Sequence, residues 1–494
     1  MNIDESVKNR LVAELRLFRA FTYMRLTTWF GDVPFLTSNP TLPESKNISR
    51  TSADEIKAFI HSELEAVSHI LPKNTEIPTD ENGRVTCGTA VALNARAYLL
   101  DNDFENCARE CEKLINSSEY GTYALASSYA DLFVNGHYGS ESILTLEYAY
   151  EGGVENIKRS WDTGSRIPQS IGSGAIVAFS PTQELVNCYR KTDGSVADDT
   201  DYENRDLRFY ATIAYNGCTI EIPEAKACKI IGSEGVGKGT YTCWTNPDDA
   251  AEAQKTDPAL VDAYNGTQDR TLTGYYNIKN YVANTVGAGG GSYKPLMEMR
   301  YADVLLMYAE SMYETGQLTS EIWDMTIRPL RERSGVSGAM PATADPYLAS
   351  YYDGVTDKWI LECRRERSIE LYMENTRRDD LMRWRMGHKL TVEFAGIHIP
   401  ELGKPFDMNG DGKNDLCFYS KSHPKSGSNQ TGVSYVEVTA EEGDNVTTYS
   451  VNKDNCLVYI LDREWADYKY LYPVPKNALD INPNLRPQNP GWDD

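Results

Sequence analysis

Apolar residues recur at helical spacing near the start of the chain. Five of them fall within roughly 80° of one another on a helical wheel. They are Leu11, Leu15, Phe18, Leu26 and Trp29. We therefore predict a first helix that buries this stripe. The helix should end at Gly31, because glycine readily adopts the left-handed conformation that closes many helices.

The following segment contains a helical hairpin. Ser52 and Glu55 have the spacing of a capping box at the start of another helix. The alanine-rich segment 89–100 and the segment 104–115 then flank a three-residue loop, which predicts two antiparallel helices. Tyr98, Phe104 and Cys107 match the spacing of a tetratricopeptide repeat. Cys107 and Cys111 are expected to be buried thiols.

The helical pattern fades in the middle of the chain and then returns. We divide the single predicted domain into N-terminal tetratricopeptide-like helices (1–135), an irregular lobe (136–295), C-terminal tetratricopeptide-like helices (296–390) and a region of loops, hairpins and a proline-rich tail (391–494). Within the second helical group, 357–373 is rich in arginine and glutamate, and we expect Glu366 and Glu370 on its outer face. Asn375 suits a left-handed break after this helix.

Composition narrows the functional classes. The 494 residues have a formal net charge of −23, which argues against nucleic-acid binding because phosphates require lysine and arginine. No apolar run approaches the roughly 20 residues of a membrane helix. The 32 tyrosines and 8 tryptophans provide aromatic rings with a polar group, which suit partly wet surfaces, including those that bind sugars.

Motifs for catalysis are weak. The six histidines have no metal-ligand spacing, and no G-x-S-x-G nucleophile elbow occurs. Carboxylates are plentiful, but the sequence does not place two of them at the separation that a glycosidase needs. A glycoside hydrolase remains an alternative to a binding protein at this point.

The middle region supplies the candidate ligand-binding residues. They are aromatic side chains set among polar and glycine-rich segments, outside any periodic stripe. They are Trp161, Trp244, Tyr275, Tyr276 and Tyr281. Flat sugar faces could stack on such rings, whereas a buried anchor for a loop is the alternative for each.

Residues 407–415, DMNGDGKND, have the spacing of a calcium-binding loop. The oxygen ligands would come from Asp407, Asn409, Asp411, the carbonyl of Lys413 and Asp415. Position 12 is Phe418 and no helices flank the loop, so this is not an EF-hand. We favour a structural Ca²⁺ site, with a hairpin turn as the alternative.

Five longer motifs follow one another along the chain. They are AELRLFRAFTYMRLTTWFGDVPFLT (13–37), GTAVALNARAYLLDNDFENC (88–107), RYADVLLMYAESMYE (300–314), RRERSIELYMENTRRDDLMRW (364–384) and NPNLRPQNPGW (482–492). In this order they resemble the SusD/RagB family of nutrient-binding outer-membrane lipoproteins of the Bacteroidetes. Together they span nearly the whole chain, and their common order makes the resemblance specific.

The resemblance implies a mostly α fold, in which a scaffold of tetratricopeptide-like helical pairs carries a large irregular lobe. It also implies a cell-surface protein that binds oligosaccharides without catalysis and delivers them to a SusC-like TonB-dependent porin. A peptide-binding member of the family is an alternative. Because sugar contacts in the family lie on variable loops, the resemblance assigns no individual residue.

The family also normally carries a secretion signal, a lipidated cysteine and a further segment before the first signature helix. In this sequence that helix begins about ten residues from the start. We therefore expect the N-terminal segment, with its lipid anchor to the external face of the outer membrane, to be absent from this chain.

Overall fold

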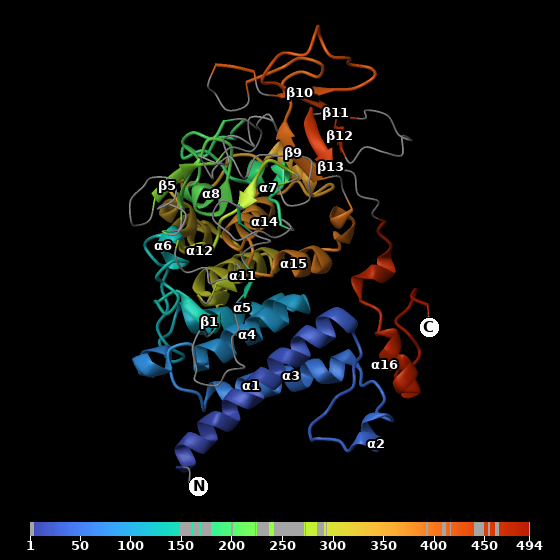
Figure 1. Ribbon diagram of the computed structural model, residues 1–494. Helices are drawn as coiled ribbons and strands as arrows, with labels where there is room; N and C mark the ends of the chain where they lie inside the picture. The colour runs from blue at the N-terminus through green and yellow to red at the C-terminus, as the bar shows by residue number, and fades with distance from the viewer. Residues whose placement is uncertain are drawn as a thin grey trace.

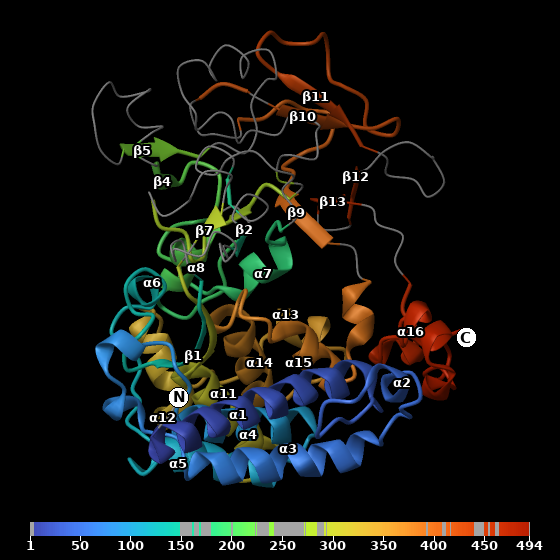
Figure 2. The same cartoon turned by 60° about the horizontal axis from the view of Figure 1, so that its bottom comes forward.

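The computed structural model comprises a helical scaffold, an irregular lobe and a C-terminal tail (Figure 1). It describes residues 4–148, 161–162, 167–168, 179–198, 201–222, 224, 237–241, 271, 273–283, 291–292, 294–391, 394–407, 412–414, 416–438, 449–452, 455–459 and 464–493. Turned by 60°, the scaffold helices form one side of the molecule, and most strands lie on the other (Figure 2).

Most of the long helices belong to the scaffold, and shorter ones lie in the lobe and the tail. The α-helices are α1 (Glu5–Phe30), α2 (Leu42–Ser45), α3 (Ala53–Ser68), α4 (Cys87–Leu100), α5 (Phe104–Ile115), α6 (Tyr129–Leu132), α7 (Gln183–Cys188), α8 (Leu207–Thr212), α11 (Tyr301–Glu314), α12 (Ser320–Arg333), α13 (Pro346–Tyr351), α14 (Lys358–Glu370), α15 (Arg377–Arg383) and α16 (Lys476–Ile481). The 3₁₀ turns are η1 (Asn74–Glu76), η2 (Thr79–Glu81), η4 (Gly387–Leu390), η5 (Asp467–Tyr470) and η6 (Pro483–Leu485).

The scaffold helices pack in succession. Helix α1 contacts α3, α3 contacts α4, α4 contacts α5, α5 contacts α11, and α11 contacts both α12 and α14. The sequence brings α4 and α5 together through a tight turn, where the Asp103 side chain accepts a hydrogen bond from Asn106 N (3.1 Å). Alanines leave α4 thin enough to be buried on nearly every side. The predicted hairpin and the burial of Cys107 and Cys111 are thereby confirmed.

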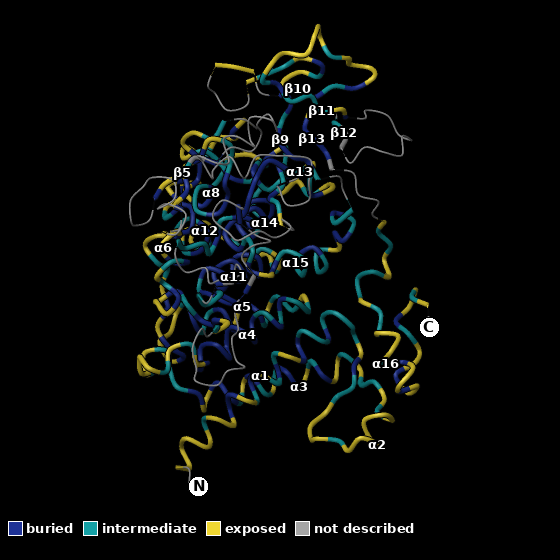
Figure 3. The backbone as a smooth tube through the Cα atoms, viewed as in Figure 1, coloured by how far each residue is buried: buried dark blue, intermediate teal, exposed yellow. Residues whose placement is uncertain are grey.

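Helix α1 ends at Gly31 as predicted, with φ +69°, but it buries a different face. Leu11, Leu15 and Phe18 are exposed, Leu15 at 70%. The prediction that they form the buried stripe is wrong. A second stripe of helical period packs on α3 instead, and it contains smaller or more polar residues. Its members are Ala13, Leu17, Ala20, Met24 and Thr27. Figure 3 shows exposed residues recurring along α1 between buried ones.

Helix α14 places its charges inside the protein. Glu366 accepts hydrogen bonds from Arg208 Nη1 (2.7 Å) and Arg331 Nε (2.8 Å). Glu366 and Glu370 are both at most 1% exposed, so the prediction of an outer charged face is wrong. The charges can be buried because each carboxylate meets arginines from other elements.

Glu370 lies at the centre of this buried ionic network. Its carboxylate accepts hydrogen bonds from Arg300 Nη1 (2.7 Å), Arg208 Nη1 (2.8 Å) and the Arg333 guanidinium. Arg208 lies in the first turn of helix α8 in the lobe, whereas Arg300 ends strand β8 and Arg333 ends α12. The network therefore joins the lobe to the scaffold.

The strands are short and form small separate sheets. They are β1 (Ser142–Leu146), β2 (Trp161–Asp162), β3 (Ile213–Ala214), β4 (Thr219–Ile222), β5 (Gly237–Thr240), β6 (Tyr276–Asn277), β7 (Gly291–Ser292), β8 (Leu296–Arg300), β9 (Phe394–His398), β10 (Leu416–Tyr419), β11 (Ser434–Glu437), β12 (Tyr449–Val451) and β13 (Cys456–Tyr459). Antiparallel pairs join β1 to β8, β2 to β7, β3 to β6 and β4 to β5. Strands β10 and β11 are parallel, and β13 lies between β12 and β9.

The C-terminal tail returns to the first helix. Asn489 Nδ2 donates to Phe30 O (2.9 Å) and Tyr472 O (2.7 Å), and Tyr472 N donates to Trp29 O (2.7 Å). Arg50 adds hydrogen bonds to Pro487 O (2.8 Å) and Asn489 Oδ1 (2.6 Å). The proline-rich tail contains η5, α16 and η6. Within the residues that the structure describes, no helix has the length and apolar character needed to cross a membrane.

Candidate functional site

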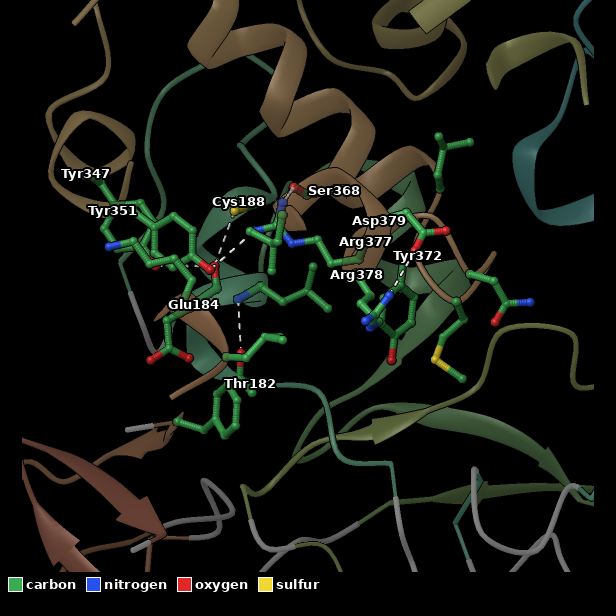
Figure 4. Close-up of a pocket in the computed structure, with 18 of the residues that line it drawn as sticks. Thr182, Glu184, Cys188, Tyr347, Tyr351, Ser368, Tyr372, Arg377, Arg378 and Asp379 are labelled. Atoms are coloured by element: carbon green, nitrogen blue, oxygen red, sulfur yellow. Dashed lines mark hydrogen bonds and ion pairs between the residues drawn. The ribbon is translucent and has the colours of Figure 1, made fainter. Parts of the chain in front are cut away.

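A cavity of about 620 Å³ lies where the lobe meets the scaffold (Figure 4). This volume lies in the range of pockets that bind small molecules. Side chains from α1, α7, α13, α14, α15, the connection between α14 and α15, η4 and β9 line it. The residues used below are Arg25, Trp29, Thr182, Glu184, Cys188, Tyr347, Tyr351, Ser368, Tyr372, Arg377, Arg378, Asp379 and Lys389.

Two short segments present the aromatic side chains. Helix α13 starts at Pro346, and Tyr347 and Tyr351 lie four residues apart, so they project from the same side of the helix. After α14, Met373 and Asn375 adopt φ values of 60° and 62°, which turn the chain sharply into α15. The predicted left-handed break at Asn375 is confirmed. The turn brings Tyr372 to the cavity opposite Tyr351 (Figure 4).

Arg377 lies against hydroxyl groups on the cavity wall. Its Nη1 donates to Tyr352 OH (3.0 Å) and Ser368 Oγ (2.9 Å), and its Nη2 donates to Tyr351 OH (3.3 Å). Its guanidinium carbon lies 5.8 Å from the ring centres of both Tyr351 and Tyr352. These contacts hold the planar group in one orientation.

Other charged side chains that line the cavity form ion pairs or hydrogen bonds within the protein. Lys389 Nζ is 2.8 Å from Asp353, and Arg378 Nη1 is 3.3 Å from Asp379. Burial raises the pKa of Asp379, although Arg378 partly opposes this shift. Glu184 Oε1 accepts a hydrogen bond from Ala395 N (3.0 Å), which ties α7 to β9.

The chemistry of the cavity suits binding. Burial raises the pKa of the Cys188 thiol to about 11, so it is protonated at neutral pH and is a poor nucleophile. Its Sγ donates to Glu184 O (3.3 Å). In the described part of the chain, no group of three or more His, Cys, Asp or Glu side chains could hold a metal ion.

The described members of the aromatic set chosen from the sequence lie elsewhere. Tyr275 and Tyr276 are fully buried in the lobe, where Tyr275 OH donates to Gln183 Oε1 (2.7 Å). A ring with no exposed face cannot stack on a sugar, so the structure contradicts their assignment to a ligand surface. Trp161 is 5% exposed, and its Nε1 donates to Lys294 O (3.0 Å), which makes it an anchor for a loop.

Tyr281 is half-buried, and its hydroxyl donates to Glu221 O (3.1 Å). Trp244 lies outside the described residues. None of the described residues of the aromatic set lines the cavity. The sequence missed the cavity because its aromatic side chains come from helix ends and turns, where they do not differ from core residues. Of the residues around the cavity, the sequence pattern singled out Asn375, and only as a break in the chain after a helix.

The proposed calcium loop is described only in part. Asp407 Oδ2 accepts a hydrogen bond from Gly412 N (2.7 Å), and Gly412 has φ +86°. Asp407 and Lys413 are described, whereas Asn409, Asp411 and Asp415 lie outside the described residues. The turn at Gly412 suits both a calcium loop and a simple turn, so calcium binding stays a prediction.

Comparison with known proteins identifies related sequences and structures. The sequence model of the SusD family matches residues 140–492. SusD-like protein P2 of Formosa agariphila is 25% identical over 416 residues, which cover 83% of this chain and 71% of the relative. SusD-like protein P25 of the same organism is 28% identical over 179 residues, which cover 35% of this chain and 32% of the relative.

Solved structures share the fold. A SusD-like carbohydrate-binding protein from Bacteroides fragilis has a TM-score of 0.70 and 25% identity, and the match covers 98% of this chain and 81% of that one. A laminarin-binding SusD-like protein has a TM-score of 0.55 and 18% identity, over 100% and 81% of the two chains. The expected helical fold with an irregular lobe is confirmed.

Proposed function

Because this chain belongs to the SusD family, we propose that it captures oligosaccharides at the cell surface in the cavity between its scaffold and its lobe. A structural relative at 25% identity is a SusD-like carbohydrate-binding protein, and two others are named for laminarin binding and surface-glycan binding, so we assign this chain a binding role and not a catalytic one. The glycoside hydrolase alternative is therefore dropped.

The observation that carries this proposal is the set of aromatic rings around the 620 Å³ cavity. Trp29, Tyr347, Tyr351 and Tyr372 come from three separate segments and line the same space. Aromatic rings provide flat apolar surfaces for the faces of sugar rings. Charged and hydroxyl side chains between them can bind sugar hydroxyls, which fixes the orientation of a ligand.

Calorimetry with a panel of oligosaccharides tests the proposal. Tyr347→Ala and Tyr372→Ala should each weaken binding of the best ligand by about tenfold or more, because each removes one stacking surface. Tyr138→Ala is the matched control, since Tyr138 is an exposed tyrosine that does not line this cavity. Equal binding by all three variants and the parent would place the carbohydrate site elsewhere.

The finer biological role rests on the family. We propose that the bound oligosaccharide passes to a SusC-like TonB-dependent porin, and that a lipid anchor holds the protein on the external face of the outer membrane. Co-purification with such a porin from solubilised outer membranes is the expected result. If this protein is present in the solubilised outer membranes but purifies without a porin, the delivery step is contradicted.

We also propose that residues 407–415 bind Ca²⁺ as a structural ion. The hydrogen bond between Asp407 and Gly412 supports a tight loop of this kind. Chelation should lower the melting temperature of the parent and leave that of Asp407→Ala unchanged. An equal melting temperature of the parent with and without chelator would favour the simple turn.

A further inference from the structure

Arg377 differs from the other cations of the cavity in its partners. Its hydrogen bonds reach only the neutral hydroxyls of Tyr351, Tyr352 and Ser368. Within the described part of the chain, it forms no ion pair with a carboxylate. In contrast, Arg25 pairs with Glu298, Arg378 with Asp379 and Lys389 with Asp353.

Arg377 is half-buried, and a guanidinium that is partly removed from water without a counter-charge is unfavourable. Hydroxyl groups accept its hydrogen bonds but do not neutralise its charge. The buried ionic network shows the usual arrangement in this protein, because Arg208 and Arg300 each contact two or more carboxylates. The position of Arg377 on a cavity wall leaves room for a counter-ion that is not part of the protein.

The charges of the lining single out Arg377. Among the described lining residues, four side chains are cationic and two are anionic. Three of these cations pair with carboxylates, two of which (Glu298 and Asp353) are not lining residues, so pairing among the described residues leaves Arg377 without a carboxylate partner. The cationic residues are Arg25, Arg377, Arg378 and Lys389, and the anionic ones are Glu184 and Asp379. An anionic ligand would balance the charge of Arg377, because a cavity with low-dielectric walls focuses the field of a charge that no carboxylate neutralises.

From this geometry we propose that the cavity recognises acidic oligosaccharides, with Arg377 binding the carboxylate of a uronic acid or the sulfate ester of a sugar. The planar fork of arginine matches the paired oxygens of either group. Tyr351 and Ser368 act as positioning residues, since their hydroxyls hold the guanidinium in place. This inference rests on the proposed function and adds the ligand class.

The first test changes the ligand and leaves the protein intact. Calorimetry should show that the parent binds galacturonate oligomers about 10–100-fold more tightly than the same oligomers as methyl esters. Sulfated and desulfated galactan oligomers form the second pair of ligands. Tighter binding of one charged form identifies carboxylate or sulfate as the source of the anion. Equal affinity for the charged and neutral members of both pairs would overturn the inference.

The second test assigns the effect to Arg377. Arg377→Gln should abolish the preference for the charged oligomer, so that the variant binds the charged and neutral forms of each pair with equal affinity. Arg328→Gln is the matched control, because Arg328 is an exposed arginine on α12 that pairs with Asp324. An undiminished preference for the charged form in Arg377→Gln would overturn the assignment.

Ser368→Ala provides a milder variant if Arg377→Gln fails to fold. Loss of one positioning hydroxyl should reduce the preference for the charged form by a few-fold, and an unchanged preference would count against the assignment.

The proposal of carbohydrate binding and the proposal of acidic specificity fail in different ways. If neutral and charged oligomers bind equally, carbohydrate binding stands and the acidic specificity fails. If no oligosaccharide binds at all, both fail.

Discussion

Helices α4 and α14 both lie inside the scaffold, but they are buried by different means. Helix α4 presents Ala90, Ala92 and Leu93, which leave almost no surface to solvent. Helix α14 presents Glu366 and Glu370 to arginines from other elements. The first is held mainly by close packing, whereas the second depends on the presence of each ionic partner.

The apolar core around α4 and the ionic core around α14 should differ in how well they tolerate substitutions. An apolar core accepts side chains of similar volume at low cost. A buried ion pair gains little over an apolar replacement of both partners, but removal of one partner leaves an uncompensated charge. Isosteric substitutions in the two helices therefore provide a direct way to separate packing from charge.

The largest effect is expected at the centre of the ionic network. Glu370→Gln keeps the shape of the side chain but removes the negative charge shared by Arg300, Arg208 and Arg333. We expect it to lower the free energy of unfolding by about 3–5 kcal/mol, measured by urea denaturation. A loss below about 1 kcal/mol would show that the network does not require this charge.

A somewhat smaller effect is expected in the apolar helix. Leu93→Ala should cost about 3 kcal/mol because it leaves a cavity in a closely packed layer. Leu93→Met, which nearly conserves volume, should cost less than about 1.5 kcal/mol in the same denaturation experiment. If the methionine variant were as unstable as Glu370→Gln, the distinction between the two cores would fail.

Acid should act mainly on the ionic core. Burial alone would raise the pKa of Glu370, but Arg333, Arg300 and Arg208 outweigh it, so its pKa in the folded protein is lowered. The pKa of Glu366 is lowered for the same reason, by Arg208 and Arg331. These groups therefore contribute stability above their unfolded pKa of about 4.3, and this stability is lost as the pH falls toward their folded values.

Urea denaturation at several pH values between about 6 and 3 should show this loss. The slope should be shallower for Glu370→Gln than for the parent, since the variant no longer has this carboxylate to protonate. Leu93→Ala should retain the parental slope and differ only by a constant offset. Parallel slopes for all three proteins would contradict the role of Glu370.

The smallest effect is expected at the protein surface. Glu63 accepts hydrogen bonds from Arg16 Nη2 (2.7 Å) and Arg19 Nη2 (2.9 Å) where α3 meets α1. Both arginines are about a third exposed, so Glu63→Gln should cost less than about 1 kcal/mol. This loss should shrink in high salt, whereas the effect of Glu370→Gln should persist. A salt-independent loss of several kcal/mol would place Glu63 with the buried network instead.

The same contrast explains which parts of the fold could be predicted from the sequence. The α4–α5 hairpin was predictable because its apolar period and its Asp103 cap act within a few residues. The buried face of α1 was not, because two stripes have the same period and the packing on α3 selects the one with smaller residues. The burial of Glu370 depends on Arg208, Arg300 and Arg333, which lie far apart in the sequence.

The cavity was beyond sequence reasoning for a similar reason. Its walls come from segments between residues 25 and 394, and only the fold brings them together. Tyr275 and Tyr276 looked like surface aromatics because their neighbours are polar, yet they fill the core of the lobe. Arg377 was visible in the sequence only as one of many arginines, and its lack of a carboxylate partner among the described residues is a property of the folded chain.

The hydrogen bond between Asn489 and Phe30 has a consequence for the order in which the molecule is made. The two residues are 459 positions apart, so during synthesis the end of the first helix emerges long before the tail that covers it. Trp29 lines the cavity, and its carbonyl accepts a hydrogen bond from Tyr472 N in the same tail. Because domains fold as the ribosome releases them, the end of the first helix gains these hydrogen bonds only when translation is almost finished. A chain that stops short of its last residues would lack the hydrogen bonds that hold the end of the first helix beside the cavity.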